Sequence, residues 1–533
     1  MEIAKSPEKE TAFNGKPDKN LLAKFNSQIK SKVPHWEEGA NGSSIQNPTP
    51  LTDITNDLML CARTEYGLEL PRKIRIFGKL DSQIYGGSVK VRPMVQIIED
   101  AIKTGRLRTG QIIFEATSGN FGIALGMLRS LGLEVITLVS RKLQEGVIEE
   151  LERQGVKTID LDVDICPAPG LQMDQNTLMA KTVAQNIQQQ LSEYGLDTSI
   201  YDQSLPGVLQ LLARQDVIGL AKHLAKIYNG FCPEQYDNEY NMLAHETVTG
   251  PEIDQQLIRH GYSLEDFRIV TTFGTGGTAT GLSNYTQKKY GKKNLHIVYP
   301  LNNQDVAGIR TKDKSIGLKF YRPDQYLGQH EADFEAAKPL FRYFARKGYD
   351  IGESSALALY ATLQMLNYGV GERFVIILAD GVEKYQKTLG PFAEEKKYEL
   401  TVEEARANPQ EYGTVLWTHT AFAPRTEGVE LIASSLGLKP DKVRIARAQD
   451  VQTLISTEKI PETFKALIPD KGKTLLVCMV GATSLRVAEL LGTKGIDALS
   501  ITGGIMGLSQ TGKAPAEIVQ MATEYPIVCY CES

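Results

Sequence analysis

Three short segments of this 533-residue chain combine side chains that could do chemistry with glycines that let a ligand approach the backbone. The first, residues 86–93, places Lys90 in a glycine-framed turn, and a lysine amine can act as a nucleophile or a base. The second, residues 117–122, reads Thr-Ser-Gly-Asn-Phe-Gly, and the third, residues 274–278, reads Gly-Thr-Gly-Gly-Thr. Together and in this order, they predict an aldehyde cofactor bound to Lys90 as a Schiff base, with its phosphate in the third segment.

Glycines and threonines alone make up the third segment: Gly274, Thr275, Gly276, Gly277 and Thr278. It follows a strand predicted at residues 267–272, and the backbone N–H groups of such a turn converge at the start of the next helix, where they bind a phosphate. The alternative is a dinucleotide-binding turn with Ala279 as its third small residue, which requires an acidic residue about 20 positions later. The next predicted strand ends with Val298-Tyr299-Pro300 instead, so the sequence favours a phosphate site.

Hydroxyl, amide and glycine residues open the second segment: Thr117, Ser118, Gly119 and Asn120. Two hydroxyl groups and an amide at a helix N-terminus can bind a carboxylate. The same residue types also cap helices without binding a ligand. Taken alone, the segment favours the capping interpretation, and both interpretations stay open at this point.

Apolar periodicity places these segments in an alternation of strands and helices. Strands are predicted at residues 111–115, 134–140, 156–161, 267–272, 295–299 and 374–378, and helices at residues 94–104, 121–131 and 144–154. This alternation predicts an α/β fold with a parallel sheet. Residues 173–230 interrupt it with two amphipathic helices, predicted at residues 177–193 and 207–228, which we interpret as an insertion or a lid.

The composition, with 42% hydrophobic and 23% charged residues, is typical of a soluble globular protein of several domains. The net charge of −5 predicts no binding to nucleic acid or an anionic membrane, and no apolar run reaches the roughly 18 residues of a membrane helix. The six cysteines form no disulfide framework, and no cysteine and histidine cluster has zinc-binding spacing. A reduced, cytoplasmic protein is predicted, with residues 1–20 disordered or loosely attached.

Five motifs in order make residues 50–390 resemble the cysteine synthase and cystathionine β-synthase family, the fold-type II pyridoxal-phosphate enzymes. They are Gly87-Ser88-Val89-Lys90, residues 115–125, residues 245–253, residues 274–278 and Gly352-Glu353-Ser354-Ser355. The resemblance implies a tryptophan synthase β-like fold with two α/β subdomains. It also implies pyridoxal 5'-phosphate as the cofactor.

The same resemblance implies a role for each motif. Lys90 would hold the cofactor as a Schiff base and then move the α-proton of the substrate. Asn120 would bind the 3-hydroxyl of the cofactor, and Ser354, or the adjacent Ser355, would face its pyridine nitrogen. The substrate carboxylate would lie against Thr117, Ser118, Gly119 and Asn120, which reverses the preference for capping.

The implied reaction is β-replacement on an activated serine, with a sulfur nucleophile giving cysteine or a related amino acid. A close alternative is β-elimination from cysteine. Two alternatives of other classes are a non-catalytic sulfur-carrier or regulatory protein and a nicotinamide oxidoreductase. Family members are commonly homodimers. Phe121 stands where the family has a small hydroxyl residue, and both it and residues 173–230 are expected to border the substrate, so the leaving group and the nucleophile stay open.

A second α/β unit is predicted after the charged residues 394–397, with strands at residues 415–417, 474–477 and 498–501 and a helix at residues 485–491. Residues 400–510 resemble a rhodanese-like domain, which implies sulfur transfer by Cys478 at a helix N-terminus that stabilises a thiolate. The alternative is a buried structural cysteine, and the loop lacks the usual arginine of such domains.

Cys529 and Cys531 could relay sulfur by thiol exchange, although an exposed tail is the favoured interpretation. The predicted domains are an N-terminal extension at residues 1–50, a catalytic domain at residues 51–393 and a rhodanese-like domain at residues 398–533.

Overall fold

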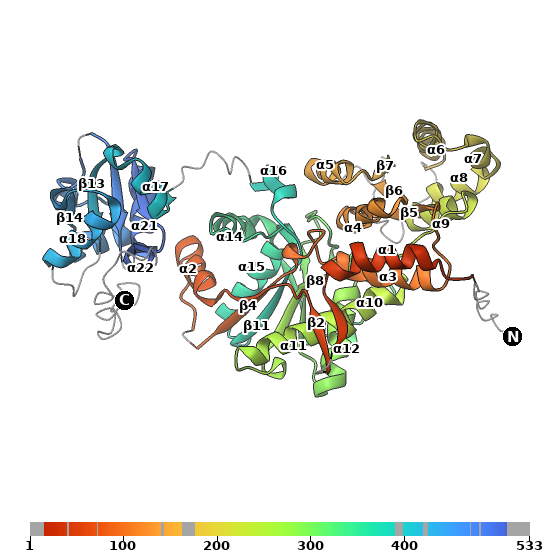
Figure 1. The fold of residues 1–533 in the computed structure, drawn as a ribbon, viewed down its shortest axis with the longest axis horizontal. Helices are drawn as coiled ribbons and strands as arrows, with labels where there is room; N and C mark the ends of the chain where they lie inside the picture. The colour runs from red at the N-terminus through yellow and green to blue at the C-terminus, as the bar shows by residue number, and fades with distance from the viewer. Residues whose placement is uncertain are drawn as a thin grey trace. The chain divides into compact units, whose positions relative to one another are not determined.

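The computed structural model describes residues 15–39, 42–71, 73–139, 143–161, 176–389, 398–418, 425–469, 471–478 and 481–508. Its internal contacts divide the chain into two compact units, Met1–Phe392 and Ala393–Ser533 (Figure 1). The predicted linker at residues 394–397 lies outside the described residues. Among the described helices, none combines the length and the apolarity needed to span a membrane.

A six-stranded sheet forms the centre of the first unit, in the order β10-β9-β8-β11-β4-β3. Its strands are β3 (Leu51–Asp53), β4 (Arg75–Leu80), β8 (Arg268–Thr272), β9 (Leu295–Pro300), β10 (Gly328–Ala332) and β11 (Arg373–Leu378). All neighbouring strands run parallel except β3, which is antiparallel to β4. The α/β prediction is confirmed. The predicted parallel sheet comprises β4, β8, β9, β10 and β11, and the antiparallel edge strand β3 was not predicted, since three residues are too short to show a period.

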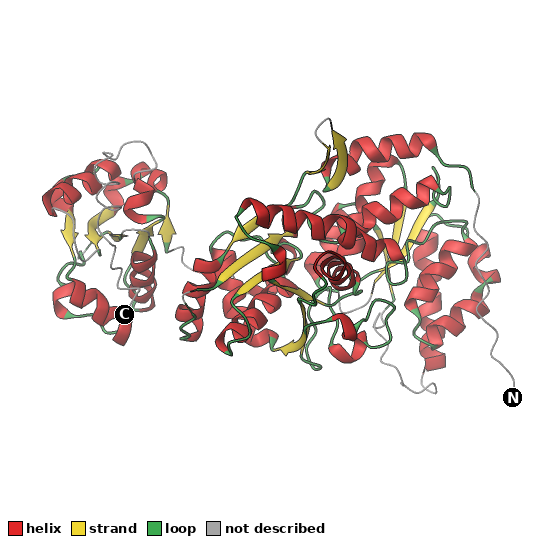
Figure 2. Ribbon diagram, turned by 90° about the horizontal axis from the view of Figure 1, so that it is seen from below, coloured by secondary structure: helices red, strands yellow, loops and turns green. Residues whose placement is uncertain are grey.

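Helices cover both faces of this sheet (Figure 2). Phe374 faces one core and its neighbour Val375 the other, because successive side chains of a strand point in opposite directions. The helices on the Phe374 side are α2 (Thr55–Tyr66), α14 (Phe334–Arg346) and α15 (Glu353–Asn367). Those on the Val375 side are α11 (Gly250–Arg259) and α12 (Gly277–Tyr290). The first unit also contains three short helices, α10 (Glu239–Ala244), α13 (Lys312–Ser315) and α16 (Gln386–Leu389).

A second, parallel sheet of the first unit consists of β5 (Ile112–Ala116), β6 (Glu134–Val139) and β7 (Lys157–Asp160). The helices beside it are α3 (Val91–Lys103), α4 (Asn120–Gly126) and α5 (Glu145–Arg153). All three strands and the helices at residues 94–104 and 144–154 were predicted within a few residues. The helix predicted at residues 121–131 is α-helical only to Gly126 and continues as a 3-10 helix, Met127–Leu131.

The insertion covers one face of the second sheet, where Ile187 and Leu220 pack with Phe114, Ile136 and Leu138 (Figure 1). Its helices are α6 (Asn176–Glu193), α7 (Thr198–Gln203), α8 (Leu205–Ala213) and α9 (Val217–Ile227). The prediction of a single helix at residues 207–228 is wrong, because the chain turns at Gln215, whose φ of 54° is left-handed. The shared core favours the insertion over the lid.

The N-terminal residues of the described chain are anchored, not loose. Helix α1 (Lys19–Gln28) buries Leu21 and Phe25 in the main core, and Asp18 Oδ1 accepts a hydrogen bond from the backbone N–H of Leu21 at 3.0 Å. The prediction of a loose segment is therefore wrong from residue 18 onward. An antiparallel hairpin follows, β1 (His35–Gly39) and β2 (Gly42–Gln46).

The second unit is a parallel sheet in the order β12-β16-β15-β13-β14 with helices on both faces. Its strands are β12 (Glu399–Leu400), β13 (Tyr412–Trp417), β14 (Val443–Ile445), β15 (Lys473–Val477) and β16 (Ala498–Ile501). The helices on one face are α17 (Val402–Ala407), α18 (Arg425–Leu436) and α22 (Gly504–Leu508), and those on the other are α19 (Ala448–Thr457), α20 (Glu462–Lys465) and α21 (Ala482–Thr493). The three predicted strands and the predicted helix are confirmed.

Candidate active site

Lys90 lies at the start of α3, in the turn that leaves the central sheet. The backbone N–H of its neighbour Val89 donates to the carbonyl of Ala379 at 2.7 Å, which fixes the turn against the end of β11. Lys90 Nζ donates to Thr275 Oγ1 at 3.4 Å. Burial, and after it the positive charge of Arg310, lowers the pKa of Lys90 to about 8. The lysine is therefore a stronger candidate nucleophile at neutral pH than an exposed lysine.

One cavity brings most of the predicted site residues together from four separate segments. Those that line it are Lys90, Asn120, Gly274, Thr275, Gly276, Thr278 and Ser354. Gly277 begins the adjoining helix α12. The turn at residues 117–119 does not line this cavity in the described structure. The cavity therefore brings together Lys90, the predicted phosphate turn and Ser354. The predicted carboxylate turn adjoins the cavity, because Asn120 follows that turn and lines the cavity.

The glycine turn that ends β8 leaves no room for a side chain. Gly276 adopts a φ of 89°, which favours glycine, and a Cβ at Gly277 would lie 2.1 Å from Asn241 Oδ1. Thr275 Oγ1 accepts hydrogen bonds from Asn241 Nδ2 at 3.0 Å and from the Gly277 N–H at 3.4 Å. Such a close-packed turn at the start of the 14-residue helix α12, beside a lysine amine, fits a group that carries both a phosphate and an aldehyde.

Thr278 is held on the other side of the same turn. Its hydroxyl lies 3.1 Å from His245 Nε2, and His245 Nδ1 lies 3.0 Å from Thr249 Oγ1. Both contacts come from a π-helix, His245–Thr249, an element that is frequent at functional sites. Burial, followed by the charges of Arg92 and Lys90, holds the pKa of His245 well below its usual value, so His245 is neutral here.

The turn at residues 117–119 is capped by its own side chain. Thr117 Oγ1 accepts from the backbone N–H of Gly119 at 3.1 Å and from that of Gly122 at 3.3 Å. Gly119 has a φ of 119°, and a Cβ there would lie 2.3 Å from Val147 Cγ1. Ser118 is exposed. Thr117 therefore caps the start of α4, as the capping interpretation expects, whereas the hydroxyl of Ser118 is accessible to a ligand.

Asn120 is held between opposite charges. Its Nδ2 donates to Asp380 Oδ2 at 2.8 Å, and its Oδ1 accepts from Lys384 Nζ. Lys384 and Asp380 also form an ion pair at 3.2 Å, and the hydroxyl of Tyr385 donates to Asp380 Oδ2. No sequence motif pointed to Asp380 or Lys384.

The two adjacent serines at the start of α15 lie in different surroundings. Ser354 lines the cavity, whereas Ser355 Oγ accepts a hydrogen bond from the backbone N–H of Ala379 at 2.9 Å. Ser355 is fully buried. Its hydroxyl therefore supports the turn after β11, and Ser354 has the geometry for a contact to a ligand.

Glu353 was not predicted as a site residue, although it precedes Ser354 in a quoted motif. It accepts hydrogen bonds from the Ala307 N–H at 3.1 Å, Gln144 Nε2 at 2.8 Å and Thr388 Oγ1 at 2.5 Å. Burial raises the pKa of Glu353. Because Ala307 lines the cavity and Gln144 precedes α5, this carboxyl group links the cavity lining to the start of α5.

Phe121, which was expected to border the substrate, does not line the cavity in the described structure. Its side chain is 1% exposed and packs in the main core, away from the cavity lining. The insertion likewise packs on the second sheet. Among the described residues, neither Phe121 nor the insertion from residue 176 onward lines the cavity.

A buried charge cluster lies beneath the start of α3 and consists of Lys79, Asp81, Arg92 and Glu252. Arg92 pairs with Asp81 Oδ1 at 2.7 Å and with Glu252 Oε2 at 2.7 Å, and Lys79 Nζ lies 2.5 Å from Glu252 Oε1. All four side chains are at most 2% exposed. The cluster has two charges of each sign, and it anchors α3 two residues after Lys90.

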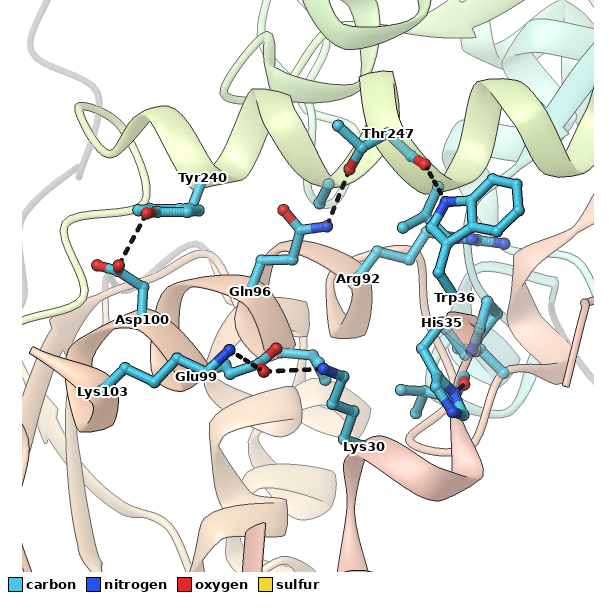
Figure 3. A pocket seen from close by; sticks show the side chains of 16 residues that line it. Lys30, His35, Trp36, Arg92, Gln96, Glu99, Asp100, Lys103, Tyr240 and Thr247 are labelled. Atoms are coloured by element: carbon cyan, nitrogen blue, oxygen red, sulfur yellow. Dashed lines mark hydrogen bonds and ion pairs between the residues drawn. The ribbon is translucent and has the colours of Figure 1, made fainter. Parts of the chain in front are cut away.

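A second pocket lies between α3, the segment that enters β1, and α10 with the following π-helix (Figure 3). Trp36 Nε1 donates to the Thr247 carbonyl at 2.6 Å, and Gln96 Nε2 donates to Thr247 Oγ1 at 3.2 Å. Lys30 Nζ pairs with Glu99 at 2.8 Å. In the described structure none of the predicted site residues lines this pocket.

In the second unit, Cys478 directly follows β15 and is 3% exposed. Its Sγ accepts from the Gly481 N–H at 3.1 Å and from Ser484 Oγ at 3.4 Å, while Ser484 Oγ lies 2.8 Å from Ser500 Oγ. The tail with Cys529 and Cys531 lies outside the described residues.

A protein-family description, pyridoxal-phosphate dependent enzyme, matches residues 58–380. The cysteine synthase of Staphylococcus aureus (strain Mu50) is 27% identical over 322 residues, which are 59% of this chain and 88% of that protein. Cysteine synthase B of Salmonella typhimurium (strain LT2) is 26% identical over 325 residues, 60% of this chain and 89% of that protein. The crystal structure of an O-acetylserine dependent cystathionine beta-synthase from Helicobacter pylori aligns with a TM-score of 0.47 and 22% identity, covering 64% of this chain and 94% of that one.

Proposed function

The chain belongs to the family of pyridoxal-phosphate dependent enzymes, and on this basis we propose that it catalyses β-replacement, forming cysteine or a related amino acid from an activated serine and a sulfur nucleophile. The observation that carries the proposal is the convergence of Lys90, Asn120 and Ser354 with the glycine turn of α12 on one cavity. The similarity to cysteine synthases supports a sulfur nucleophile.

In this proposal, residues 274–278 and the N-terminus of α12 hold the cofactor phosphate, Asn120 contacts the 3-oxygen and Ser354 contacts the pyridine nitrogen. Bound to Lys90, the cofactor supplies an electron-poor ring that stabilises the electron pair left at the α-carbon of the substrate. The neutral hydroxyl of Ser354 places no charge beside the ring nitrogen, which favours loss of the β-substituent over transamination.

Lys90 attaches the cofactor and accepts the α-proton. Both tasks need the neutral amine, and a pKa of about 8 provides more of it at neutral pH than an ordinary lysine would. Ser118 and the backbone N–H groups of its turn bind the substrate carboxylate, and Thr117 holds that turn in shape through Gly119 and Gly122. In the net reaction the β-carbon to oxygen bond breaks, a carbon–sulfur bond forms, and the leaving group departs as an anion.

The test combines a spectrum, a mass and a product. The purified protein with added cofactor is expected to show the visible absorbance of a lysine-bound cofactor, and borohydride reduction is expected to fix one cofactor on the peptide that contains Lys90. O-acetylserine or O-phosphoserine with sulfide should then yield cysteine, whereas cysteine alone yielding sulfide and pyruvate would favour β-elimination. A Lys90→Ala variant that keeps the visible band would refute the assignment of Lys90.

We also propose that the second unit carries sulfur on Cys478. The support is its Sγ, which accepts hydrogen bonds from the Gly481 N–H at the start of α21 and from Ser484. In the expected step, thiosulfate transfers its outer sulfur to the Cys478 sulfur and sulfite leaves. Cyanide should then release that sulfur as thiocyanate from the wild type but not from Cys478→Ser. Equal amounts from both proteins would leave Cys478 with a structural role.

A further inference from the structure

The amide of Asn120 has a single orientation that its neighbours allow. Lys384 carries only donors, so it can contact only Oδ1, and an ionised Asp380 carries only acceptors, so it can contact only Nδ2. A flipped amide would place Nδ2 against the ammonium group and Oδ1 against the carboxylate. The two opposite charges therefore select one of two amide orientations that have nearly the same shape.

The contacts leave a defined hydrogen-bonding capacity on Asn120. Its amide nitrogen has two hydrogens: one goes to Asp380 Oδ2, and the nitrogen also lies beside the hydroxyl of Tyr385, so a ligand oxygen in the cavity would share or replace that second contact. Asn120 lines the cavity, and Gly308 of the same cavity lies close to the nitrogen, since a Cβ at Gly308 would be 3.7 Å from Asn120 Nδ2. The group that Asn120 presents to a ligand in the cavity is therefore an N–H donor and not its carbonyl oxygen.

Asp380 and Lys384 are themselves held in place by packing. Tyr385 donates its hydroxyl to Asp380 Oδ2, and burial, followed by the charge of Asp380, raises the pKa of Tyr385 well above its usual value, so that it remains a donor. Gly352 provides the space for the other carboxylate oxygen, because a Cβ there would lie 2.1 Å from Asp380 Oδ1. The side chain of Lys384 is only 10% exposed. A pair this enclosed can fix a neighbouring amide, unlike an exposed ion pair.

We propose that Lys384 and Asp380 are positioning residues that clamp Asn120 so that it donates a hydrogen bond to the 3-oxygen of the cofactor and keeps that oxygen ionised. The inference rests on the proposed placement of the cofactor in the Lys90 cavity. A donor stabilises the ionised oxygen, whereas the carbonyl of a flipped amide would stabilise the protonated form. The clamp adds no net charge, because its ammonium and carboxylate groups balance.

Other charges face the same corner of the cavity and have to be kept constant in a test. Lys90 lines the cavity with Asn120, and Glu353 precedes Ser354 on α15. Neither is altered by a change at Lys384. Because Lys384→Met leaves the charge of Asp380 unbalanced, it is compared with the double variant Lys384→Met with Asp380→Asn, which removes both charges. A double variant that titrates as the wild type would assign the shift to charge and overturn the clamp.

The experiment uses the full chain loaded with cofactor and compares Lys384→Met, Lys384→Arg and a control, Lys338→Met. Lys338 lies on α14 in a pair with Glu335 at 2.7 Å and does not line the cavity. The first readout is the pH titration of the visible absorbance of the bound cofactor, and the second is the dissociation constant of the cofactor from fluorescence. Lys384→Met should move the titration to higher pH and weaken cofactor binding about tenfold. Lys384→Arg, which keeps the donor, should restore both, and Lys338→Met should match the wild type.

Each outcome tests either the proposed cofactor site or the clamp on Asn120. A wild type without the visible band would contradict the proposed cofactor site itself. A wild type with the band and a Lys384→Met variant with the same titration and affinity would overturn the clamp alone. If Lys384→Met does not fold, judged by circular dichroism, Gly352→Ala provides the same test from the other side, since its methyl group displaces Asp380 Oδ1. A Gly352→Ala protein that folds and titrates as the wild type does would also overturn the clamp.

Discussion

Gly276 and Gly481 adopt nearly the same left-handed φ, and the surroundings of the two glycines differ. Each follows a buried parallel strand and opens a helix, with φ values of 89° and 91°. At Gly276 the groups that meet the turn, Lys90 and Asn241, come from segments far away in the sequence. At Gly481 the turn is filled by its own neighbours, Cys478 and Ser484. A glycine turn after a strand thus creates a potential anion site, and the distant residues determine whether a ligand fits there.

The two units also differ in what they bury. The first unit encloses the cluster of Lys79, Asp81, Arg92 and Glu252 below the lysine turn. In the described part of the second unit, the buried polar residues are all serines and threonines. Buried charges are costly unless every one is paired, so the first unit depends on specific partners in a way that the second does not.

The largest expected effect is the loss of the buried cluster. Arg92→Leu leaves Asp81 without its charged partner and should destabilise the first unit by about 3–5 kcal/mol. Each unit contains one tryptophan, Trp36 or Trp417, so urea unfolding followed by fluorescence in a Trp417→Phe background reports on the first unit alone. The matched change in the second unit, Lys473→Leu, is measured in a Trp36→Phe background, where Trp417 reports on that unit; it breaks an exposed pair with Glu411 and should cost less than about 1 kcal/mol. If the two variants lost the same unfolding free energy, the first unit would not depend on its charged partners more than the second unit does.

The cluster also predicts the pH dependence of the first unit. Burial opposes ionisation of Glu252, but Arg92 and Lys79 outweigh it and hold the pKa of Glu252 below its usual value. A carboxyl group with a lowered folded-state pKa contributes stability that is complete above its unfolded pKa of about 4.3 and is lost as the pH falls through the folded-state pKa. The loss of stability at acidic pH should be smaller in Glu252→Gln than in the protein with Glu252. It is measured as the change in the urea unfolding midpoint between neutral and acidic pH, in the Trp417→Phe background. An identical acid profile would contradict the role of Glu252.

A pair of glycine substitutions tests the two turns directly. Gly276→Ala and Gly481→Ala both force a positive φ on alanine, which costs about 1–2 kcal/mol. At Gly276 the methyl group would also lie 2.6 Å from Phe273 Cζ, whereas its nearest neighbour at Gly481 is the Gly503 nitrogen at 3.0 Å. Only Gly276→Ala should weaken cofactor binding, measured by fluorescence titration. Weaker binding in Gly481→Ala, or none lost in Gly276→Ala, would show that the two turns are not functionally distinct.

The sequence predicted the parts of the site that depend on local pattern and missed those that depend on distant partners. Lys90 and the turn at residues 274–278 were readable because glycine spacing and strand ends are local signals. Asp380 and Lys384 were missed, since they reach Asn120 across 260 and 264 residues of chain. The break between α8 and α9 was missed for a different reason, because Gln215 adopts a positive φ without a glycine to signal it.

The smallest expected effect concerns the charge that surrounds Lys90. Burial is the main reason for its lowered pKa and Arg310 the second, so Arg310→Gln should raise the pKa of Lys90 but leave it below that of an exposed lysine. The cofactor-free protein captures the aldehyde through the neutral amine, so the rate of cofactor attachment should rise with pH and its midpoint should move to higher pH in the variant. Stopped-flow absorbance measures this rate. The control is Arg373→Gln, at the first residue of β11. An unchanged midpoint in Arg310→Gln would mean that burial alone sets the reactivity of Lys90. The charge of Arg310 would then not contribute to the difference between the site at Gly276 and the turn at Gly481.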